Sequence, residues 1–432
     1  MSKAWSFRDT LRPMRGNMLV LTLTGVLGMF GRSMAFPYAS LYILALGGEP
    51  AQIGLINSLM PLAGLLVFPL AGYLADHAGR VKIIVLAGYL SSATLLLYVF
   101  APSWRLIALA ALLQGFMVIQ FPASSAIIAD SLSPGDRGTG FAVMWALIGA
   151  PAMFSPYLAG TLIDLLGADV GMRYLYGFLA LAYLVSATIN LRFLKETSQP
   201  SGARTGLSDI PGTLRNAYAG IPEMLRQLPR SLKALALVII LGFMANAIAG
   251  PFWVVYAVEH IGLSSTDWGL ILLVETALKS LIYIPAGVMV DRWGRTKCVL
   301  ASLLLSLVSL PLFAISSSFI HVLLIRAAAA LASAFSIPAC SALMADTVPR
   351  DKRGRVMAAL GRGTLMIGAA SGGTGGPGVG FLVTIPLMIA SLSGGYLYSW
   401  NPVYPWAFVL VATLAAVILS ALFIRDPDEA EL

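Results

Sequence analysis

Residues 72–82 read Gly-Tyr-Leu-Ala-Asp-His-Ala-Gly-Arg-Val-Lys, and residues 287–297 repeat the pattern as Gly-Val-Met-Val-Asp-Arg-Trp-Gly-Arg-Thr-Lys. The shared aspartates, Asp76 and Asp291, lie 215 positions apart (291 − 76) in a chain of 432 residues. A match at half the chain length indicates that one half of the molecule repeats the other.

Two further echoes keep nearly this spacing. Residues 122–130 return as 338–346, followed at the same offset by Arg137-Gly138 and Arg353-Gly354, and a weaker echo sets Leu27-Gly28…Pro37 against Leu241-Gly242…Pro251. Three echoes in register predict a duplicated chain, and duplication in an apolar chain is typical of membrane transporters.

The composition excludes a soluble protein. Hydrophobic residues make up 58% of the chain and charged residues 11%, and the mean hydropathy is +0.84. Soluble domains carry roughly 25% charged residues. The first apolar run is too long for a signal-peptide core, so we interpret it as a retained helix. Cys298 and Cys340 lie at or inside apolar segments, which makes a disulfide framework implausible.

Long apolar runs predict an all-α integral membrane protein, because a spanning helix needs about 20 mostly apolar residues and lipid-exposed backbone must pair within its own segment. We expect twelve spans, at 17–45, 52–75, 81–101, 106–131, 140–164, 173–194, 234–258, 268–290, 297–317, 321–346, 378–399 and 402–424.

The positive charges predict the orientation. Segments on the side of the termini hold 23 of the 28 Lys and Arg residues, whereas the opposite loops hold only Arg105 and Arg173. By the positive-inside rule, both termini face the cytoplasm and the protein resides in the cell membrane. The net charge of +8 is thus a topological signal, and we expect no nucleic-acid partner.

We therefore divide the chain into two six-helix bundles with short tails. The expected parts are a tail at 1–16, a bundle at 17–194, a linker at 195–233, a second bundle at 234–424 and a tail at 425–432. The linker alternates apolar and basic residues at helical spacing, which suits either a basic amphipathic helix on the inner leaflet or a solvated connection.

With two six-helix halves and Gly-x-Leu-x-Asp-x-x-Gly-Arg-x-Lys after the second span, the chain resembles the major facilitator superfamily, including its drug and metabolite efflux branch. The second copy departs from the signature only at Met289, which replaces Leu. The resemblance implies two pseudo-symmetric bundles of six helices that move around a central site.

The resemblance also implies that the charged clusters latch the two halves together on the cytoplasmic side when the transporter faces outward. Gly79 and Gly294 permit tight turns, and the aspartates can pair with nearby arginines or helix N-termini. The alternative is that these charges only mark turns. The candidate latch residues are Gly72, Asp76, Gly79, Arg80, Asp130, Arg137, Gly287, Asp291, Gly294, Arg295, Asp346 and Arg353.

Two patterns of proton antiporters are incomplete here. The fifth span has Pro151-x-x-x-Ser155-Pro156-x-x-Ala159-Gly160 where such relatives have Gly-x-x-x-Gly-Pro-x-x-Gly-Gly, and the fourth span has Gln114-Gly115 without the usual arginine. These departures leave proton antiport open.

Charged residues inside spans are functional candidates, because a charge in lipid is costly. Arg32, Glu275, Lys279 and Arg326 all lie on helices that can line a central cavity, and their net charge of +2 favours an anionic solute. Alternatively, Glu275 and Lys279 neutralise each other one turn apart while Arg326 snorkels outward. Glu275 is the candidate proton carrier. Further candidate solute contacts are Asn57, Gln114, Gln120, Tyr157, Asn246, Trp253 and Tyr256.

The second half carries a glycine-rich insertion near 368–380. Its Gly-x-Gly-x-x-Gly is no nucleotide site, since no strand precedes it. Either residues 355–367 form a cytoplasmic helix and the eleventh span begins near Val379, or the glycines break that span inside the membrane.

Together these features predict a secondary transporter for a small solute that works by alternating access, with proton-coupled efflux of amphipathic or anionic compounds favoured. The alternatives are an uptake permease or uniporter and, more remotely, a non-transporting sensor or scaffold. We expect a monomer in the lipid bilayer, with no cofactor or metal beyond a coupling proton gradient, and no enzyme, because the three histidines join no catalytic or metal-ligand spacing.

Overall fold

A computed structural model describes residues 11–133, 135–197, 228–348, 353–361, 363–368 and 380–426, with side chains left out at 68–78, 353–355, 358 and 381. These residues contain twelve helices long and apolar enough to cross a membrane. The expected all-helical fold is thereby confirmed, and each expected span overlaps one of the helices.

The N-terminal half contains six spans, three of them built from two helices. They are α2 (Asn17–Ala35) with η1 (Phe36–Tyr38) and α3 (Ala39–Ala45), α4 (Pro50–Ala78), α5 (Arg80–Val99), α6 (Trp104–Phe116) with η2 (Met117–Ile119) and α7 (Gln120–Asp130), α8 (Arg137–Ala152) with α9 (Ser155–Leu166), and α10 (Ala168–Phe193).

The C-terminal half repeats this order. Its spans are α13 (Arg230–Ala249) with η4 (Gly250–Phe252) and α14 (Trp253–Glu259), α15 (Ser265–Trp293), α16 (Arg295–Ser309) with η5 (Pro311–Ile315), α17 (Phe319–Thr347), α19 (Phe381–Trp400) and α20 (Tyr404–Phe423), and the short helix α18 (Arg353–Leu360) precedes α19.

The proline and glycine echoes of the sequence have structural causes. Pro37 and Pro251 lie in the short 3-10 segments that interrupt the first and seventh spans, because proline has no N–H to continue an α-helix. Gly79 and Gly294 connect consecutive spans with φ of 88° and 96°, a backbone conformation that residues with a Cβ rarely adopt. The predicted tight turns are thus present in both halves.

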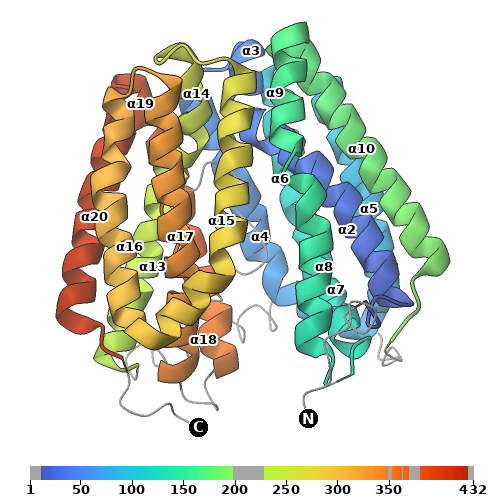
Figure 1. Cartoon of the computed structure of the whole chain (residues 1–432). Coiled ribbons are helices and arrows are strands. Elements are labelled where there is room, and N and C mark those ends of the chain that lie inside the picture. The colour runs from blue at the N-terminus through green and yellow to red at the C-terminus, as the bar shows by residue number, and fades with distance from the viewer. Residues whose placement is uncertain are drawn as a thin grey trace.

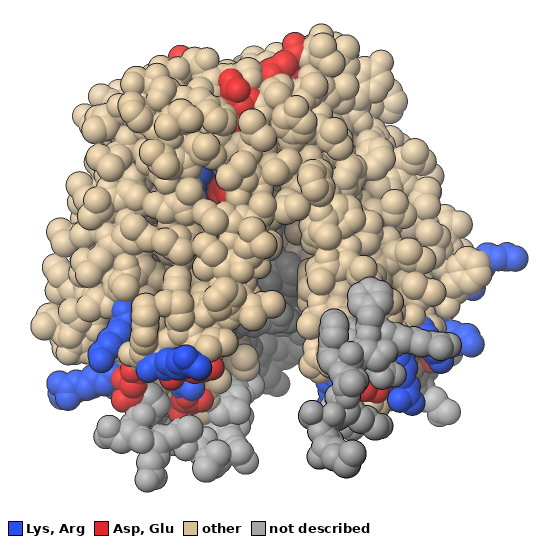
Figure 2. Space-filling view, viewed as in Figure 1, with Lys and Arg blue, Asp and Glu red and all other residues tan. Residues whose placement is uncertain are grey.

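The two halves form two bundles that converge at one face of the molecule (Figure 1). We call the face where α2 begins and α20 ends the terminal face, and the opposite face, where α9 ends and α15 begins, the far face. In the view of Figure 2, Lys and Arg gather towards the terminal face, and a hollow between the bundles opens there.

The hydrophobic core explains this shape. One large cluster combines residues of both halves at the far face, including Tyr38 and Ile53 from one bundle and Phe252 and Tyr398 from the other. The three other clusters among the described residues each belong to a single bundle. The halves therefore share apolar contacts at the far face and separate towards the terminal face.

The region of the insertion differs in part from the first of the two expected arrangements, a helix over 355–367 followed by a span from Val379. The helix expected over 355–367 ends at Leu360, and residues 363–368 are non-helical and lie inside the C-terminal bundle. The eleventh span begins at Phe381, close to the expected Val379. Most of the glycine run, the linker over 198–227 and the outermost residues of both tails lie outside the described residues, so the expected division into domains stays a prediction there.

Candidate functional site

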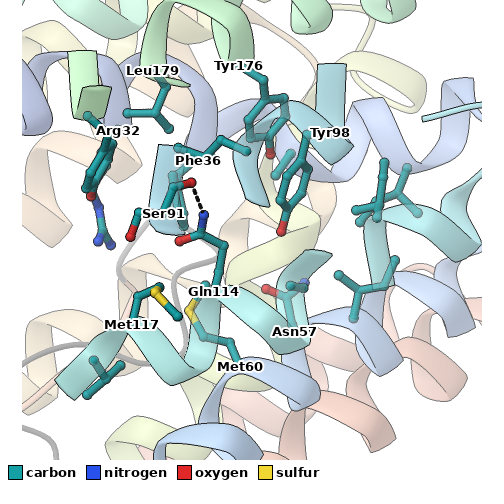
Figure 3. Close-up of a pocket in the computed structure, with 18 of the residues that line it drawn as sticks. Arg32, Phe36, Asn57, Met60, Ser91, Tyr98, Gln114, Met117, Tyr176 and Leu179 are labelled. Carbon is teal, nitrogen blue, oxygen red and sulfur yellow. Dashed lines mark hydrogen bonds between the residues drawn. The ribbon is translucent and has the colours of Figure 1, made fainter. Parts of the chain in front are cut away.

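A cavity of about 90 Å³ lies inside the N-terminal bundle (Figure 3). This volume holds several water molecules. Its wall comes from the first span, α4, α5, α6, η2, α7 and α10, and it is mainly aromatic and aliphatic with a few polar groups. The lining residues include Arg32, Phe36, Ser40, Asn57, Met60, Ser91, Leu95, Tyr98, Gln114, Met117, Gln120, Phe121, Tyr176, Leu179 and Tyr183.

Arg32 supplies the positive charge of this cavity. Its guanidinium carbon lies 4.6 Å from the centre of the Phe36 ring, one helical turn further along the span, in a cation–π contact. Among the described residues no carboxylate forms an ion pair with Arg32. A positive charge without a protein anion in a largely apolar cavity favours an anionic ligand.

The opposite wall offers hydrogen-bonding groups. Gln114 donates to the Ser91 carbonyl at 2.9 Å and contacts Thr94 Oγ1 at 2.6 Å, which fixes its amide. Ser91 is 1% exposed, and among the described residues its hydroxyl has no hydrogen-bond partner. Asn57 and Tyr98 line the same cavity, and in Figure 3 the Tyr98 hydroxyl points towards Asn57 while the Gln114 amide faces Ser91. A buried hydroxyl without a partner costs free energy unless water or a ligand meets it.

Four of the predicted solute contacts, Arg32, Asn57, Gln114 and Gln120, thus line one cavity. The others do not join them. Tyr157 is 37% exposed on α9, next to α15. Asn246 is buried on α13, and Tyr256 donates to the Ala314 carbonyl within an aromatic cluster of the C-terminal bundle.

The remaining predicted residues form a separate charged cluster in the C-terminal bundle. Arg326 is fully buried and binds Glu275 through Nε and Nη2 at 2.9 and 2.7 Å. Its guanidinium also lies 4.7 Å from the Trp253 ring centre, and Nη1 donates to the Gly368 carbonyl at 2.6 Å.

This arrangement contradicts the two alternatives raised for these charges. Arg326 does not snorkel outward, because a carboxylate and a carbonyl satisfy it inside the bundle. The main partner of Glu275 is Arg326, 51 positions away, and not Lys279 one turn along the same helix. Lys279 is still close enough to interact with both charges. The cluster therefore combines two basic side chains with one carboxylate.

The far face is closed by hydrogen bonds between the bundles. Asp164, near the end of α9, accepts from the backbone N–H groups of Ser265 and Thr266 at 2.9 and 2.8 Å and from the Thr266 hydroxyl at 2.6 Å. Tyr38 bridges the same place, donating to the Pro156 carbonyl at 2.7 Å and the Ser265 carbonyl at 3.0 Å. A carboxylate from one bundle thus caps the positive N-terminus of a helix in the other.

Sequence reasoning missed Asp164. Its signal is an acidic residue near the end of a span, which by itself looks like an ordinary loop charge. Only the crossing of α9 and α15 reveals the partner.

Glycines let the bundles meet closely on this side. A Cβ at Gly54 would lie 2.9 Å from Gly395 Cα, and a Cβ at Gly395 would lie 2.7 Å from the Pro50 carbonyl oxygen. Gly160, the glycine that survives from the antiporter pattern, lies against Ser265 of the other bundle. Small residues at such crossings allow backbones to approach. The closed far face and the separated terminal face describe a conformation open towards the terminal face.

Comparisons with known proteins agree with this architecture. A family model for the Major Facilitator Superfamily matches residues 21–234 and 235–432, one match for each half. The chain belongs to the Major Facilitator Superfamily.

Relatives in this superfamily are transporters. The chain is 26% identical over 420 residues to an uncharacterised MFS-type transporter of Methanocaldococcus jannaschii, covering 94% of this chain and 95% of that protein. It is 24% identical over 333 residues to the multi-drug resistance efflux pump PmrA of Streptococcus pneumoniae, covering 76% and 80%. The fold matches an inward-facing bacterial homologue of the human lysosomal transporter Spinster with a TM-score of 0.69 at 15% identity, covering 98% of this chain and 100% of that one. The protein is therefore a membrane transporter and not an enzyme.

The predicted latch residues of this transporter gather at the terminal face, in one cluster for each bundle. Arg80 binds Asp130 at 2.5 Å and Thr197 at 3.0 Å, with Arg137 as a further positive charge near Asp130. In the other half Arg295 pairs with Asp346. Each ion pair joins residues of its own bundle, and neither crosses to the other half.

Some predicted latch residues have other ion-pair partners than expected, and others have side chains outside the described residues. The acidic partner of Arg295 is Asp346, whereas Asp291 is exposed. The side chains of Asp76 and Arg353 lie outside the described residues, and a Cβ built at Gly287 would meet no atom within 4 Å. The N-termini of α5 and α16 also receive carboxylates, from Glu196 and Asp426, at 3.0 and 2.9 Å.

Proposed function

We propose that this transporter exports small amphipathic anions with an aromatic ring across the cell membrane in exchange for protons. The terminal face is the cytoplasmic face, by the positive-inside rule, so the conformation open there accepts solute from the cytoplasm. The bundles then rock, the far-face contacts of Asp164 break, and the terminal-face clusters latch the halves together. Similarity to an efflux pump supports export.

The observation that carries the proposed solute class is Arg32 in its aromatic cavity. A guanidinium can bind a carboxylate or sulfonate with two hydrogen bonds. The rings of Phe36 and Tyr176 and the side chain of Met60 supply an apolar wall for the rest of the solute. The unpartnered Ser91 hydroxyl gives one further polar contact on the same cavity.

Glu275 is the proposed proton carrier. Its carboxylate is 17% exposed and faces Arg326, so binding a proton cancels the ion pair and leaves the guanidinium with fewer partners. Such a change of pairing gives the C-terminal bundle two states that differ by one proton.

Binding of benzenesulfonate to the purified transporter tests the solute class, with neutral benzenesulfonamide as the matched control ligand. We expect Arg32→Gln to weaken benzenesulfonate binding at least tenfold and Arg32→Lys to weaken it less, because lysine keeps the charge without the planar fork. Benzenesulfonamide binding should change less than threefold in both variants.

Equal binding of the sulfonate by the wild type and Arg32→Gln would refute the role of Arg32. Tight binding of the sulfonamide with no binding of the sulfonate would instead indicate a neutral solute.

A further inference from the structure

The repeat makes the two bundles comparable position by position. Leu95 of the N-terminal cavity corresponds to Leu310, Met60 to Glu275 and Ala39 to Trp253. Gly28, one helical turn before Arg32, corresponds to Gly242. If the halves were packed alike, the C-terminal bundle would contain a cavity between these counterparts.

Residues 363–368 fill that place. A Cβ built at Gly28 meets nothing within 4 Å, whereas one built at Gly242 would lie 2.7 Å from Leu365 and 3.1 Å from Ile367. Leu310 lies against Gly368, 2.8 Å from a Cβ built there. Leu365 is 3% exposed.

The segment follows α17 through the bundle. Gly363 lies beside the Cys340 carbonyl, and the Gly368 carbonyl binds Arg326. Fourteen helical residues separate these contacts, or about 21 Å. Five extended residues cover roughly 17 Å, and the long Arg326 side chain covers the rest. Non-helical backbone is tolerated at membrane depth only where protein surrounds it, as here.

The groups that hold the segment occur only in this half. Arg326 corresponds to Ala110 and Glu275 to Met60, so the N-terminal bundle has neither charge at these positions. The C-terminal half thus carries both the insertion and the buried Arg326 guanidinium, which binds the Gly368 carbonyl of the insertion.

From this match we infer that residues 363–368 act as a built-in occupant of the C-terminal counterpart of the solute cavity. The segment restricts solute binding to the N-terminal bundle and so determines specificity. This inference rests on the proposed function in taking the N-terminal cavity as the solute site. The occupancy itself is independent of any solute.

Cysteine labelling tests the occupancy without measuring transport. In a background with Cys298→Ser and Cys340→Ser, we compare Gly28→Cys with Gly242→Cys, the same substitution at matched repeat positions. Full-length protein in detergent is treated with a water-soluble maleimide. We expect Gly28→Cys to react at least tenfold faster than Gly242→Cys.

A third variant identifies what protects position 242. Adding Leu365→Ala and Ile367→Ala to Gly242→Cys should raise its labelling rate to within about threefold of that of Gly28→Cys, because the side chains over Gly242 are removed. Equal labelling of the two single variants, or continued protection in the triple variant, would overturn the inference. If the triple variant no longer elutes as a monodisperse protein, it is replaced by Gly242→Cys with Leu365→Ala alone. This variant should label faster than Gly242→Cys. An unchanged labelling rate would likewise overturn the inference.

Benzenesulfonate separates this inference from the proposed function. It should slow the labelling of Gly28→Cys and also that of the triple variant, because the side chains that exclude solute from the C-terminal site are removed. If it protects neither, the proposed solute class fails while the occupancy stands. If it protects position 28 but not position 242 in the triple variant, the segment does not restrict solute binding, and the specificity role inferred for it is overturned.

Discussion

At the scale of single residues, the ion pair of Glu275 and Arg326 has the largest energetic consequences. Arg326 is fully buried, and its three hydrogen-bonding nitrogens all have partners among Glu275 and Gly368. Removing one partner of a buried pair leaves an uncompensated charge, whereas removing both charges is far less damaging.

We therefore expect Glu275→Gln to lower the free energy of unfolding by about 3–5 kcal/mol. The double variant Glu275→Gln, Arg326→Gln should recover most of that loss. Reversible unfolding in detergent, followed by circular dichroism, measures both. Asp169→Asn is the control, because Asp169 pairs with Arg173 in a part-exposed contact that contributes about 1 kcal/mol or less. A double variant less stable than the single one would contradict this assignment.

How far residues could be predicted depends on whether their partners are local. Helix order and polarity placed Arg32 and Gln114 among the candidates for a central cavity; in the structure both line the cavity inside the N-terminal bundle. The partner of Glu275 was not found, because Lys279 is its nearest basic neighbour in sequence while Arg326 comes from another helix. Distances between helices decide such pairs, and no local pattern encodes those distances.

At the scale of elements, the N-terminus of α15 is the contact that holds the far face closed. Its first N–H groups have no partner within the helix and are capped by Asp164 from the other bundle. The charge adds to the hydrogen bonds, because a carboxylate is stabilised at a helix N-terminus.

We expect Asp164→Asn to weaken this closure by about 1 kcal/mol, roughly a fivefold shift towards opening of the far face. Electron–electron distance measurements between spin labels at positions 100 and 315, exposed ends of α5 and η5, report that opening. Asp169→Asn again serves as a control, since Asp169 bonds only within α10. An unchanged distance distribution in Asp164→Asn would show that apolar packing alone closes this face.

Elements themselves were largely predictable. Length and hydropathy located all twelve spans, because lipid demands a long apolar helix whatever its neighbours. The segment over 363–368 was not predicted correctly, since its leucine, methionine and isoleucine suit a helix as well as a buried extended chain. Its conformation depends on Arg326 and Gly242, which lie on other helices.

At the scale of the whole molecule, the two bundles share one core at the far face and have separate cores elsewhere among the described residues. Each terminal-face cluster pairs charges within its own bundle, Arg80 with Asp130 and Arg295 with Asp346. Because these ion pairs form within each bundle, the transporter can close its terminal face only if charged residues there exchange their partners or gain new ones from the other bundle. The repeated signature placed both clusters on that face, but the sequence alone could not tell which conformation the molecule adopts.

Gradient-driven flux in proteoliposomes tests the central claim, proton-coupled export of a small aromatic anion, most directly. Transporter molecules with the terminal face outward are selected by labelling, and the lumen is made acidic relative to the medium. Benzenesulfonate stays ionised at these pH values, so it does not follow the gradient as a neutral acid.

Proton-coupled export predicts accumulation of benzenesulfonate in the acidic lumen, loss of accumulation when a protonophore collapses the gradient, and at least tenfold slower uptake by Arg32→Gln. Uptake that ignores the pH gradient, or that is equally fast in Arg32→Gln, would contradict it.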